Sequence, residues 1–328
     1  MIPFADLGHR RQLDRLRDLA REAWSHYGEP ASRIRLFRHG FNSTYSVQTD
    51  SGERYALRLN VNSVHDLAGI RTELAWVRAL AAETDLSVPR PRLTPDGRDH
   101  VVLSTPDFGR NVVAVAYHWL PGPDVEDRAT AEVMQAMGRA IRTLHEHGAA
   151  FQLPEDCAVQ TSQEPLIGIP NRLAELPSRE ILFKVLDRAQ TVIDQLAQEP
   201  PRLTHFDVHF SNVKWYQGQL TVFDFDDCLM SWPLMDIAQT LYYVRQQDPG
   251  PEWEAELWRG YGPGLSYASE DLEALVAGRQ LLLLNDLLGS NTHELRAMIP
   301  RYLEVTTQRL EHYLSTGKFN PRIARMGD

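Results

Sequence analysis

The 328-residue chain is poor in cysteine, with only Cys157 and Cys228. Two thiols cannot form a disulfide framework, which favours a protein of a reducing compartment. Long apolar runs are missing too, since the run Leu281–Leu284 stops at Asn285, far short of a membrane span. The first twenty residues carry charges where a signal peptide needs an apolar core. We therefore expect a cytoplasmic protein without a membrane partner.

The sequence also lacks a basic block, an internal repeat and any low-complexity segment. Its formal net charge is −10, which disfavours a nucleic-acid partner because nucleic acids attract basic surfaces. The length allows one large or two ordinary domains, and the apolar and charged fractions are those of a globular protein. The oligomeric state stays undecided by the sequence.

One stretch concentrates the polar chemistry. Residues Leu203–Asp227 read LTHFDVHFSNVKWYQGQLTVFDFDD and hold four carboxylates, two histidines and one asparagine. Two apolar runs, Val213–Tyr216 and Leu220–Phe225, flank a turn at Gln217-Gly218. This pattern predicts two short strands joined by a hairpin.

A hairpin brings its two ends together, and three polar side chains stand at these ends. Asp207 and Asn212 precede the first strand, and Asp224 lies at the end of the second. The oxygens of Asn212 and Asp224 are ligands that Mg²⁺ accepts. The carboxylate of Asp207 is then placed to take a proton from a hydroxyl.

A zinc site is the alternative interpretation of the same stretch. His205, Asp207 and His209 alternate, so on a strand all three would share one face. A metal-dependent hydrolase could use such a cluster. This interpretation leaves Asn212 and Asp224 without a role.

The spacing of these motifs carries a family resemblance. Asp207 and Asn212 match the kinase catalytic loop H-R-D-x-x-x-x-N, and Asp224-Phe225-Asp226 stands where D-F-G would stand. The chain resembles the aminoglycoside phosphotransferase and choline kinase superfamily, whose loop reads H-G-D-x-H-x-x-N and whose next strand ends in I-D-F/W-D/E. The residues in register are His205, Asp207, His209, Asn212, Asp224 and Asp226.

The chain departs from this pattern at two positions. Phe206 stands where the family usually has Gly, and Ser211 stands at another position that is often small. Phe206 puts the backbone geometry of the loop in question. In the segment after Asp224 the chain resembles the homoserine-kinase-like and bacterial stress-kinase branches of this superfamily more than its resistance enzymes.

The resemblance implies a bilobal, protein-kinase-like α+β fold. Its small N-terminal lobe, residues 1–119, would hold an antiparallel sheet, and residues 120–328 would form a larger, mainly helical lobe. Apolar periodicity and turn residues predict the individual elements. We expect strands in Ile34–Leu59, Val101–Ser104 and Val112–Trp119, and helices at Leu13–Tyr27, Leu67–Ala82, Ala129–His147, Glu180–Glu199, Ile237–Arg245, Glu252–Tyr261, Ser269–Leu288 and Glu294–Ser315.

The resemblance further implies ATP and Mg²⁺ as cofactors, with Asp207 as the base and Asn212 and Asp224 as Mg²⁺ ligands. Arg58 stands in place of the kinase lysine, with Glu73 as its partner on the next helix. The other nucleotide-binding residues would be Asn42, Ser43 and Thr44 over the phosphates, and Tyr117 and Trp119 at the adenine.

The remaining polar residues receive weaker assignments. His205, His209 and Asp236 are expected to support the loop. Candidate walls of the acceptor pocket are Asp226, Asp227, Trp232, Tyr242 and Asn285.

The expected reaction is phosphorylation of a small-molecule hydroxyl, with an aminoglycoside, choline, ethanolamine, homoserine or methylthioribose as acceptor. A protein serine would also fit. A catalytically silent kinase-like module is a further alternative, but it would have lost one of Asp207, Asn212 and Asp224.

Overall fold

The computed structural model describes residues 3–61, 66–125 and 128–327. These form two compact units, each described by itself. Unit 1 comprises Met1–Leu67, Pro89–Leu120 and Ser290–Met298; unit 2 comprises Ala68–Val88, Pro121–Gly289 and Ile299–Asp328. The predicted lobe boundary after Trp119 stays a prediction. The described residues include no helix that is both long and apolar enough to span a bilayer.

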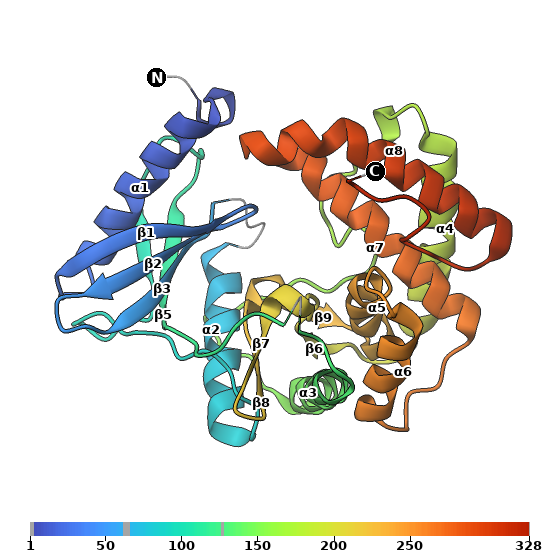
Figure 1. Ribbon diagram of the computed structural model, residues 1–328, viewed down its shortest axis with the longest axis horizontal. Coiled ribbons are helices and arrows are strands. Elements are labelled where there is room, and N and C mark those ends of the chain that lie inside the picture. Colours follow the sequence, from blue (N-terminus) through green and yellow to red (C-terminus); the bar gives the residue numbers. More distant parts are fainter. Residues whose placement is uncertain (1–2, 62–65, 126–127, 328) are drawn as a thin grey trace. The chain divides into compact units, whose positions relative to one another are not determined.

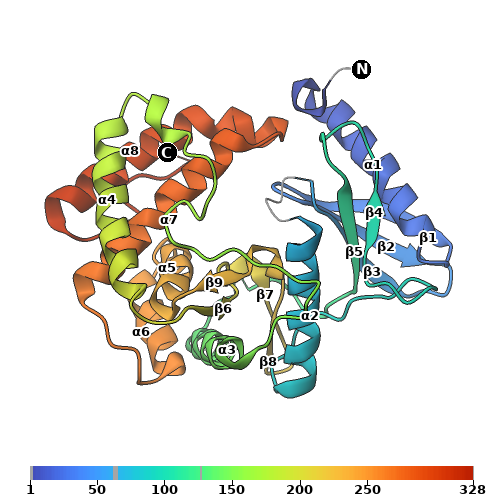
Figure 2. The same cartoon turned by 180° about the vertical axis from the view of Figure 1, so that it is seen from behind.

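Unit 1 is built on a five-stranded antiparallel sheet with the strand order β1-β2-β3-β5-β4 (Figures 1 and 2). Helix α1 packs on this sheet and contributes Leu16 and Trp24 to a core with Tyr45, Tyr55 and Leu57. The elements of this unit are η1 (Phe4–Asp6), α1 (His9–Ser25), β1 (Ala31–His39), β2 (Ser43–Thr49), β3 (Arg54–Leu59), β4 (Val101–Leu103) and β5 (Val112–His118).

Unit 2 is mainly helical and holds two small antiparallel ribbons, β6–β9 and β7–β8 (Figure 2). Helix α8 begins among the residues of unit 1 and continues in unit 2. The elements are α2 (Leu67–Glu83), α3 (Ala131–Ala150), η2 (Leu173–Glu175), α4 (Arg179–Leu196), β6 (Arg202–Thr204), η3 (Phe210–Asn212), β7 (Val213–Tyr216), β8 (Gln219–Val222), η4 (Phe225–Asp227), β9 (Leu229–Ser231), α5 (Pro233–Val244), α6 (Gly250–Tyr261), α7 (Ser269–Gly289) and α8 (His293–Thr316).

The α+β class with an antiparallel sheet followed by a helical part is confirmed, and the predicted elements recur with shifted ends. Strand β8 ends at Val222, so Asp224 follows the strand and does not end it. Helix α5 begins at Pro233 and not at Ile237, because proline suits the first turn of a helix. The β6–β9 ribbon was not predicted, since each of its strands has only three residues.

Glycines let helices α3 and α6 approach closely in unit 2. A Cβ at Gly138 of α3 would overlap the carbonyl oxygen of Leu257, and one at Gly260 of α6 would overlap that of Gln135. A Cβ at Gly148 would likewise overlap the carbonyl oxygen of Leu203. The close packing behind the candidate loop therefore depends on the absence of side chains at these three positions.

We expect Gly138→Ala to lower the free energy of unfolding by about 2–3 kcal/mol, because the clash is with backbone that cannot move aside cheaply. Urea unfolding followed by circular dichroism measures the change. Gly40→Ala is the control, since a Cβ there meets no atom within 4 Å. Equal stability of the two variants would contradict the close packing of α3 and α6.

Candidate active site

The loop between β6 and β7 contains a residue in an unusual backbone conformation. Phe206 has a φ of +64°, in the left-handed region that glycine favours. This explains why glycine is usual at this position, and a phenylalanine there costs on the order of 1–2 kcal/mol. Its ring is buried, with 1% of the residue exposed, so burial offsets the strain. The loop geometry questioned by the sequence is thus retained with Phe206 in place.

The side chain of Asp236 fixes the backbone of this loop. Its Oδ1 accepts the backbone N–H of Phe206 at 2.6 Å, and its Oδ2 lies 2.7 Å from Nε2 of His145. The hydroxyl of Tyr261 lies 3.0 Å from Nδ1 of the same histidine. Burial raises the pKa of Tyr261 to about 12, so its hydroxyl stays a donor. Asp236 is itself only 1% exposed, and it acts as an anchor between helix α3, helix α5 and the loop.

His205 links the loop to the end of the hairpin. Its Nδ1 accepts the backbone N–H of Asp207 at 3.3 Å, and its Nε2 donates to the carbonyl of Phe223 at 3.1 Å. Burial lowers the pKa of His205, so the ring stays neutral. Both ring nitrogens are therefore engaged with the backbone, and neither is left for a metal ion. Among the described residues there is no group of three His, Cys, Asp or Glu suited to a metal.

The carboxylate of Asp207 is held at both oxygens. Oδ2 accepts Nδ2 of Asn212 at 2.8 Å and lies 3.2 Å from Nε2 of His209, while Oδ1 accepts Nη2 of Arg279 at 2.5 Å. The backbone N–H of Ser211 donates to Nδ1 of His209, so Nε2 carries the hydrogen and donates to Asp207. Burial opposes ionisation, but His209 and Arg279 hold the pKa of Asp207 down at about 2. Asp207 is therefore a fixed, ionised acceptor at neutral pH.

Sequence reasoning missed two residues of this centre, Arg279 and Tyr243. Arg279 comes from helix α7 and also donates to the Tyr243 hydroxyl at 3.1 Å. The ring of Tyr243 lies 4.3 Å from the ring of His209, centroid to centroid. A signal for Arg279 existed in the sequence: it is a lone cation in the apolar stretch from Leu275 to Leu284. A cation in such a position needs a buried partner.

Two further carboxylates interact with the same centre. Burial, with the negative charge of Asp207, raises the pKa of Asp227 to about 8, against the opposing effect of Arg279. Burial also raises the pKa of Asp286 to about 6, again against Arg279 and also against Arg172. Three carboxylates thus interact electrostatically with Arg279, an arrangement that would favour an additional cation.

Asn212 lies directly before the two paired strands of the hairpin, and Asp224 follows them after Phe223. Val213 pairs with Val222, and the backbone N–H of Phe223 donates to the carbonyl of Asn212 at 2.9 Å. Asp224 has a φ of +67°, which aspartate tolerates better than most residues. The Nδ2 of Asn212 is committed to Asp207, which leaves its Oδ1 for a cation. One carboxylate and one amide oxygen fit Mg²⁺, which keeps waters and phosphates as its other ligands.

The residues predicted over the nucleotide phosphates lie in unit 1. Thr44 is paired with Arg58 across β2 and β3, Ser43 is the first residue of β2, and Asn42 lies in the turn directly before it. The Ser43 hydroxyl lies 2.8 Å from Nδ1 of His39. Asn42, Ser43 and Thr44, the residues predicted over the phosphates, therefore lie together at one end of the sheet.

Arg58 is buried beside another predicted residue. Its Nε donates to Oδ1 of Asn60 at 3.3 Å, and its guanidinium carbon lies 5.8 Å from the ring centroid of Tyr117. Trp119 follows β5, and its ring is covered by the guanidinium of Arg54 at 3.5 Å. Glu73 is buried on α2, in unit 2, and its pairing with Arg58 stays a prediction.

The residues predicted for the acceptor wall are less uniform. Asp226 lies in η4 next to Asp227. Trp232 is buried and donates to the carbonyl of Glu199 at 2.8 Å. The Tyr242 hydroxyl donates to Gln280 at 2.9 Å, and Asn285 accepts the backbone N–H of Arg172 at 2.8 Å. Trp232, Tyr242 and Asn285 thus each hydrogen-bond to groups other than Asp207. Tyr243, which was not predicted, is linked to Asp207 through Arg279.

Comparison with known proteins gives a family match. The model of a phosphotransferase enzyme family matches residues 33–274. None of the curated proteins matches the chain.

Solved structures share the fold over nearly the whole chain. A microcompartment-associated aminopropanol kinase superposes with a TM-score of 0.75 at 23% identity, over 93% of this chain and 99% of that one. The amicoumacin kinase hAmiN, in complex with AMP-PNP and Ca²⁺, gives 0.71 at 23% over 92% and 96%. A choline/ethanolamine kinase family protein from Mesorhizobium loti gives 0.59 at 16% over 90% and 92%. The predicted kinase-like fold is confirmed.

We expect Asp236→Ala to lower the free energy of unfolding by about 2–5 kcal/mol, because two buried donors, at Phe206 and His145, lose their acceptor. Chemical denaturation measures the loss. Asp248→Ala is the matched control: its carboxylate is 86% exposed and pairs only with Arg322, so we expect a change within about 0.5 kcal/mol. Similar losses in both variants would contradict the anchoring role.

Proposed function

Because the chain belongs to the phosphotransferase enzyme family, whose model matches residues 33–274, we propose that it transfers the γ-phosphoryl group of ATP to the hydroxyl of a small amino alcohol, with Mg²⁺ as cofactor. This match confirms two predictions from the sequence: that the chain belongs to the aminoglycoside phosphotransferase and choline kinase superfamily, and that it is a phosphotransferase. The observation that carries the proposal is the ionised Asp207, fixed by Asn212, His209 and Arg279.

Asp207 would orient the acceptor hydroxyl and take its proton as the oxygen–phosphorus bond forms. Its low pKa makes it a weak base. Phosphoryl transfer tolerates this, because its transition state is loose and depends on positioning more than on base strength. Asn212 and Asp224 would hold Mg²⁺, which neutralises negative charge on the phosphates. Arg58, with Glu73, would bind the α- and β-phosphates, and Thr44 lies beside Arg58 on the sheet.

The charge balance around Asp207 supports an acceptor that carries an amine. Asp227 and Asp286 have raised pKa values because they lie buried beside other carboxylates. An ammonium group near them would relieve this repulsion and would be attracted in turn. Two structures with the same fold are named for aminopropanol and for choline/ethanolamine, which agrees with this acceptor class. A silent module is disfavoured since Asp207, Asn212 and Asp224 are all present.

The nucleotide site is tested with two substitutions. We expect Asp224→Ala to weaken Mg²⁺-dependent ATP binding at least about tenfold, because Mg²⁺ loses its carboxylate ligand. We expect Asp207→Asn to keep ATP binding and to lower kcat at least about a hundredfold, because the base is lost. Calorimetric titration of ATP with and without Mg²⁺, together with ADP release, separates the two effects. ATP binding that is indifferent to both Mg²⁺ and Asp224 would refute the proposed metal site.

The acceptor class is tested with 1-amino-2-propanol against 1,2-propanediol, which replaces the amine by a hydroxyl. We expect kcat/KM for the amine, measured by ADP release at pH 7.5, to be at least about a hundredfold higher, as a buried charge pair requires. Ethanolamine and choline extend the panel. An equal kcat/KM for the diol would exclude recognition of the amine.

Asp286 should make this preference pH-dependent. Below its pKa of about 6 the carboxyl is neutral, so KM for 1-amino-2-propanol should rise as the pH falls through 6. Arg279, Arg172, Asp207 and Asp227 are the charged groups that interact with it. Asp286→Asn should raise KM at pH 7.5 about tenfold and remove this dependence. Glu270→Gln, on the exposed start of the same helix, is the control; an unchanged pH profile in Asp286→Asn would contradict the role.

A further inference from the structure

Asp207 and three other side chains form a closed ring of contacts. Oδ1 of Asp207 accepts from Arg279, Arg279 donates to the hydroxyl of Tyr243, the Tyr243 ring packs on His209, and His209 donates to Oδ2 of Asp207. The ring joins the loop to helices α5 and α7. A carboxylate gripped at both oxygens by linked partners cannot rotate without breaking a contact.

The two oxygens of Asp207 are not equally occupied. Oδ2 accepts from both Asn212 and His209, which uses the two lone-pair directions of a carboxylate oxygen. Oδ1 accepts from Arg279, and the described residues supply it with no second donor. An acceptor hydroxyl must therefore donate to Oδ1, on the side that Arg279 does not cover.

Arg279 differs from the other buried arginines of unit 2 in how it is held. Every nitrogen of the Arg309 guanidinium donates, to the carbonyl of Ala324, to Tyr242 and to Gln280. Each guanidinium nitrogen of Arg245 likewise donates to Glu254 or Glu273. The contacts of Arg279 in the described residues are through Nη2 alone, to Asp207 and Tyr243.

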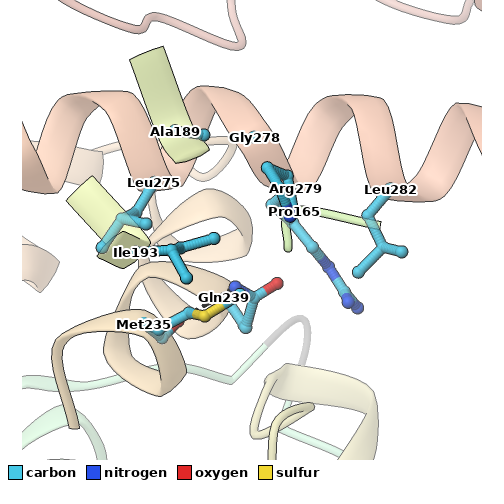
Figure 3. A pocket seen from close by; sticks show the side chains of 9 residues that line it. All are labelled: Pro165, Ala189, Ile193, Met235, Gln239, Leu275, Gly278, Arg279 and Leu282. Carbon is cyan, nitrogen blue, oxygen red and sulfur yellow. Dashed lines mark hydrogen bonds between the residues drawn. The ribbon is translucent and has the colours of Figure 1, made fainter. Parts of the chain in front are cut away.

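The shaft of Arg279 lies against a small cavity, as Figure 3 shows. The cavity measures about 10 Å³ and is lined by apolar side chains, with Gln239 beside Arg279. Nε of Arg279 and Oε1 of Gln239 are both buried without a hydrogen-bond partner among the described residues. A buried donor without a partner needs an explanation in each case, and at Arg279 the only hydrogen-bond acceptors among the described residues are those of Nη2. The catalytic carboxylate is thus the main group that orients this guanidinium.

From this geometry we propose that Arg279 is a positioning residue, one that fixes the Asp207 carboxylate so that Oδ1 faces the acceptor hydroxyl. The inference rests on the proposed role of Asp207. The family model ends at residue 274, before Arg279, so the match does not itself account for this residue.

Three variants test the inference: Arg279→Ala, Arg279→Lys and the control Arg245→Ala, which also breaks ion pairs at α7. With ATP and 1-amino-2-propanol, we expect Arg279→Ala to lower kcat about thirty- to a hundredfold, as a small misplacement of a reacting group does. KM for ATP should stay within about threefold, because Arg279 is not among the residues proposed to bind the nucleotide. Arg279→Lys keeps the positive charge but replaces the planar guanidinium by an ammonium group. We therefore expect its kcat to lie between those of the wild type and Arg279→Ala.

Chemical rescue separates positioning from loss of structure. Methylguanidinium in the millimolar range should restore kcat of Arg279→Ala at least about tenfold, since it can occupy the vacated side of Asp207. It should leave Arg245→Ala unchanged. A kcat for Arg279→Ala within threefold of wild type, or a loss that Arg245→Ala reproduces with no rescue in either variant, would overturn the proposal.

A crystal structure of Arg279→Lys or Arg279→Ala decides the question independently of the acceptor. We expect the Asp207 carboxylate to rotate away from Asn212 and His209. A carboxylate unmoved in both variants refutes the positioning role. If the wild-type protein transfers phosphate to no alcohol of the panel, the proposed function fails, and the orientation of Asp207 still decides the role of Arg279.

Discussion

The buried carboxylate of Asp236 is the constraint on which the candidate centre depends. One of its oxygens fixes the N–H of Phe206 in a backbone conformation that phenylalanine avoids, and the other binds His145 on α3. The loop does not stabilise itself through its own sequence. Its shape is imposed by a side chain from the first turn of α5, and the position of α3 depends in turn on glycines that let it approach α6. Stability and catalytic geometry therefore share the same contacts.

The second organising feature is the excess of negative charge around one arginine. Asp207 is kept ionised by His209 and Arg279, while Asp227 and Asp286 are pushed toward their neutral forms by burial and by their neighbours. Groups of the same type thus acquire different charges through position alone. Perturbed carboxylates gathered in this way are characteristic of active sites, because a folded protein holds such repulsion only where function retains it.

Local patterns predicted the parts of the molecule that local forces decide. The hairpin at Gln217-Gly218, the alternating strand β2 and the long amphipathic helices follow from short-range periodicity. Asp236 could be recognised as an anchor from its place near a helix start, but its partners could not. Arg279 and Tyr243 were missed because they reach Asp207 from helices distant in sequence. The β6–β9 ribbon escaped for the same reason, since its three-residue strands pair with each other, and β9 also pairs with Thr161, only through contacts distant in sequence.

The left-handed Phe206 has a consequence for how the protein assembles. Asp236, which fixes its backbone N–H, lies 30 positions further along the chain. His145, which contacts Asp236, lies 91 positions before Asp236. Closing such long loops costs entropy before any contact repays it, so we expect the native geometry of this loop to form late in folding. A nascent chain can therefore acquire its helices and its sheet well before it acquires catalytic competence. On this expectation, the loop takes its native shape only when helix α5 packs against it through Asp236.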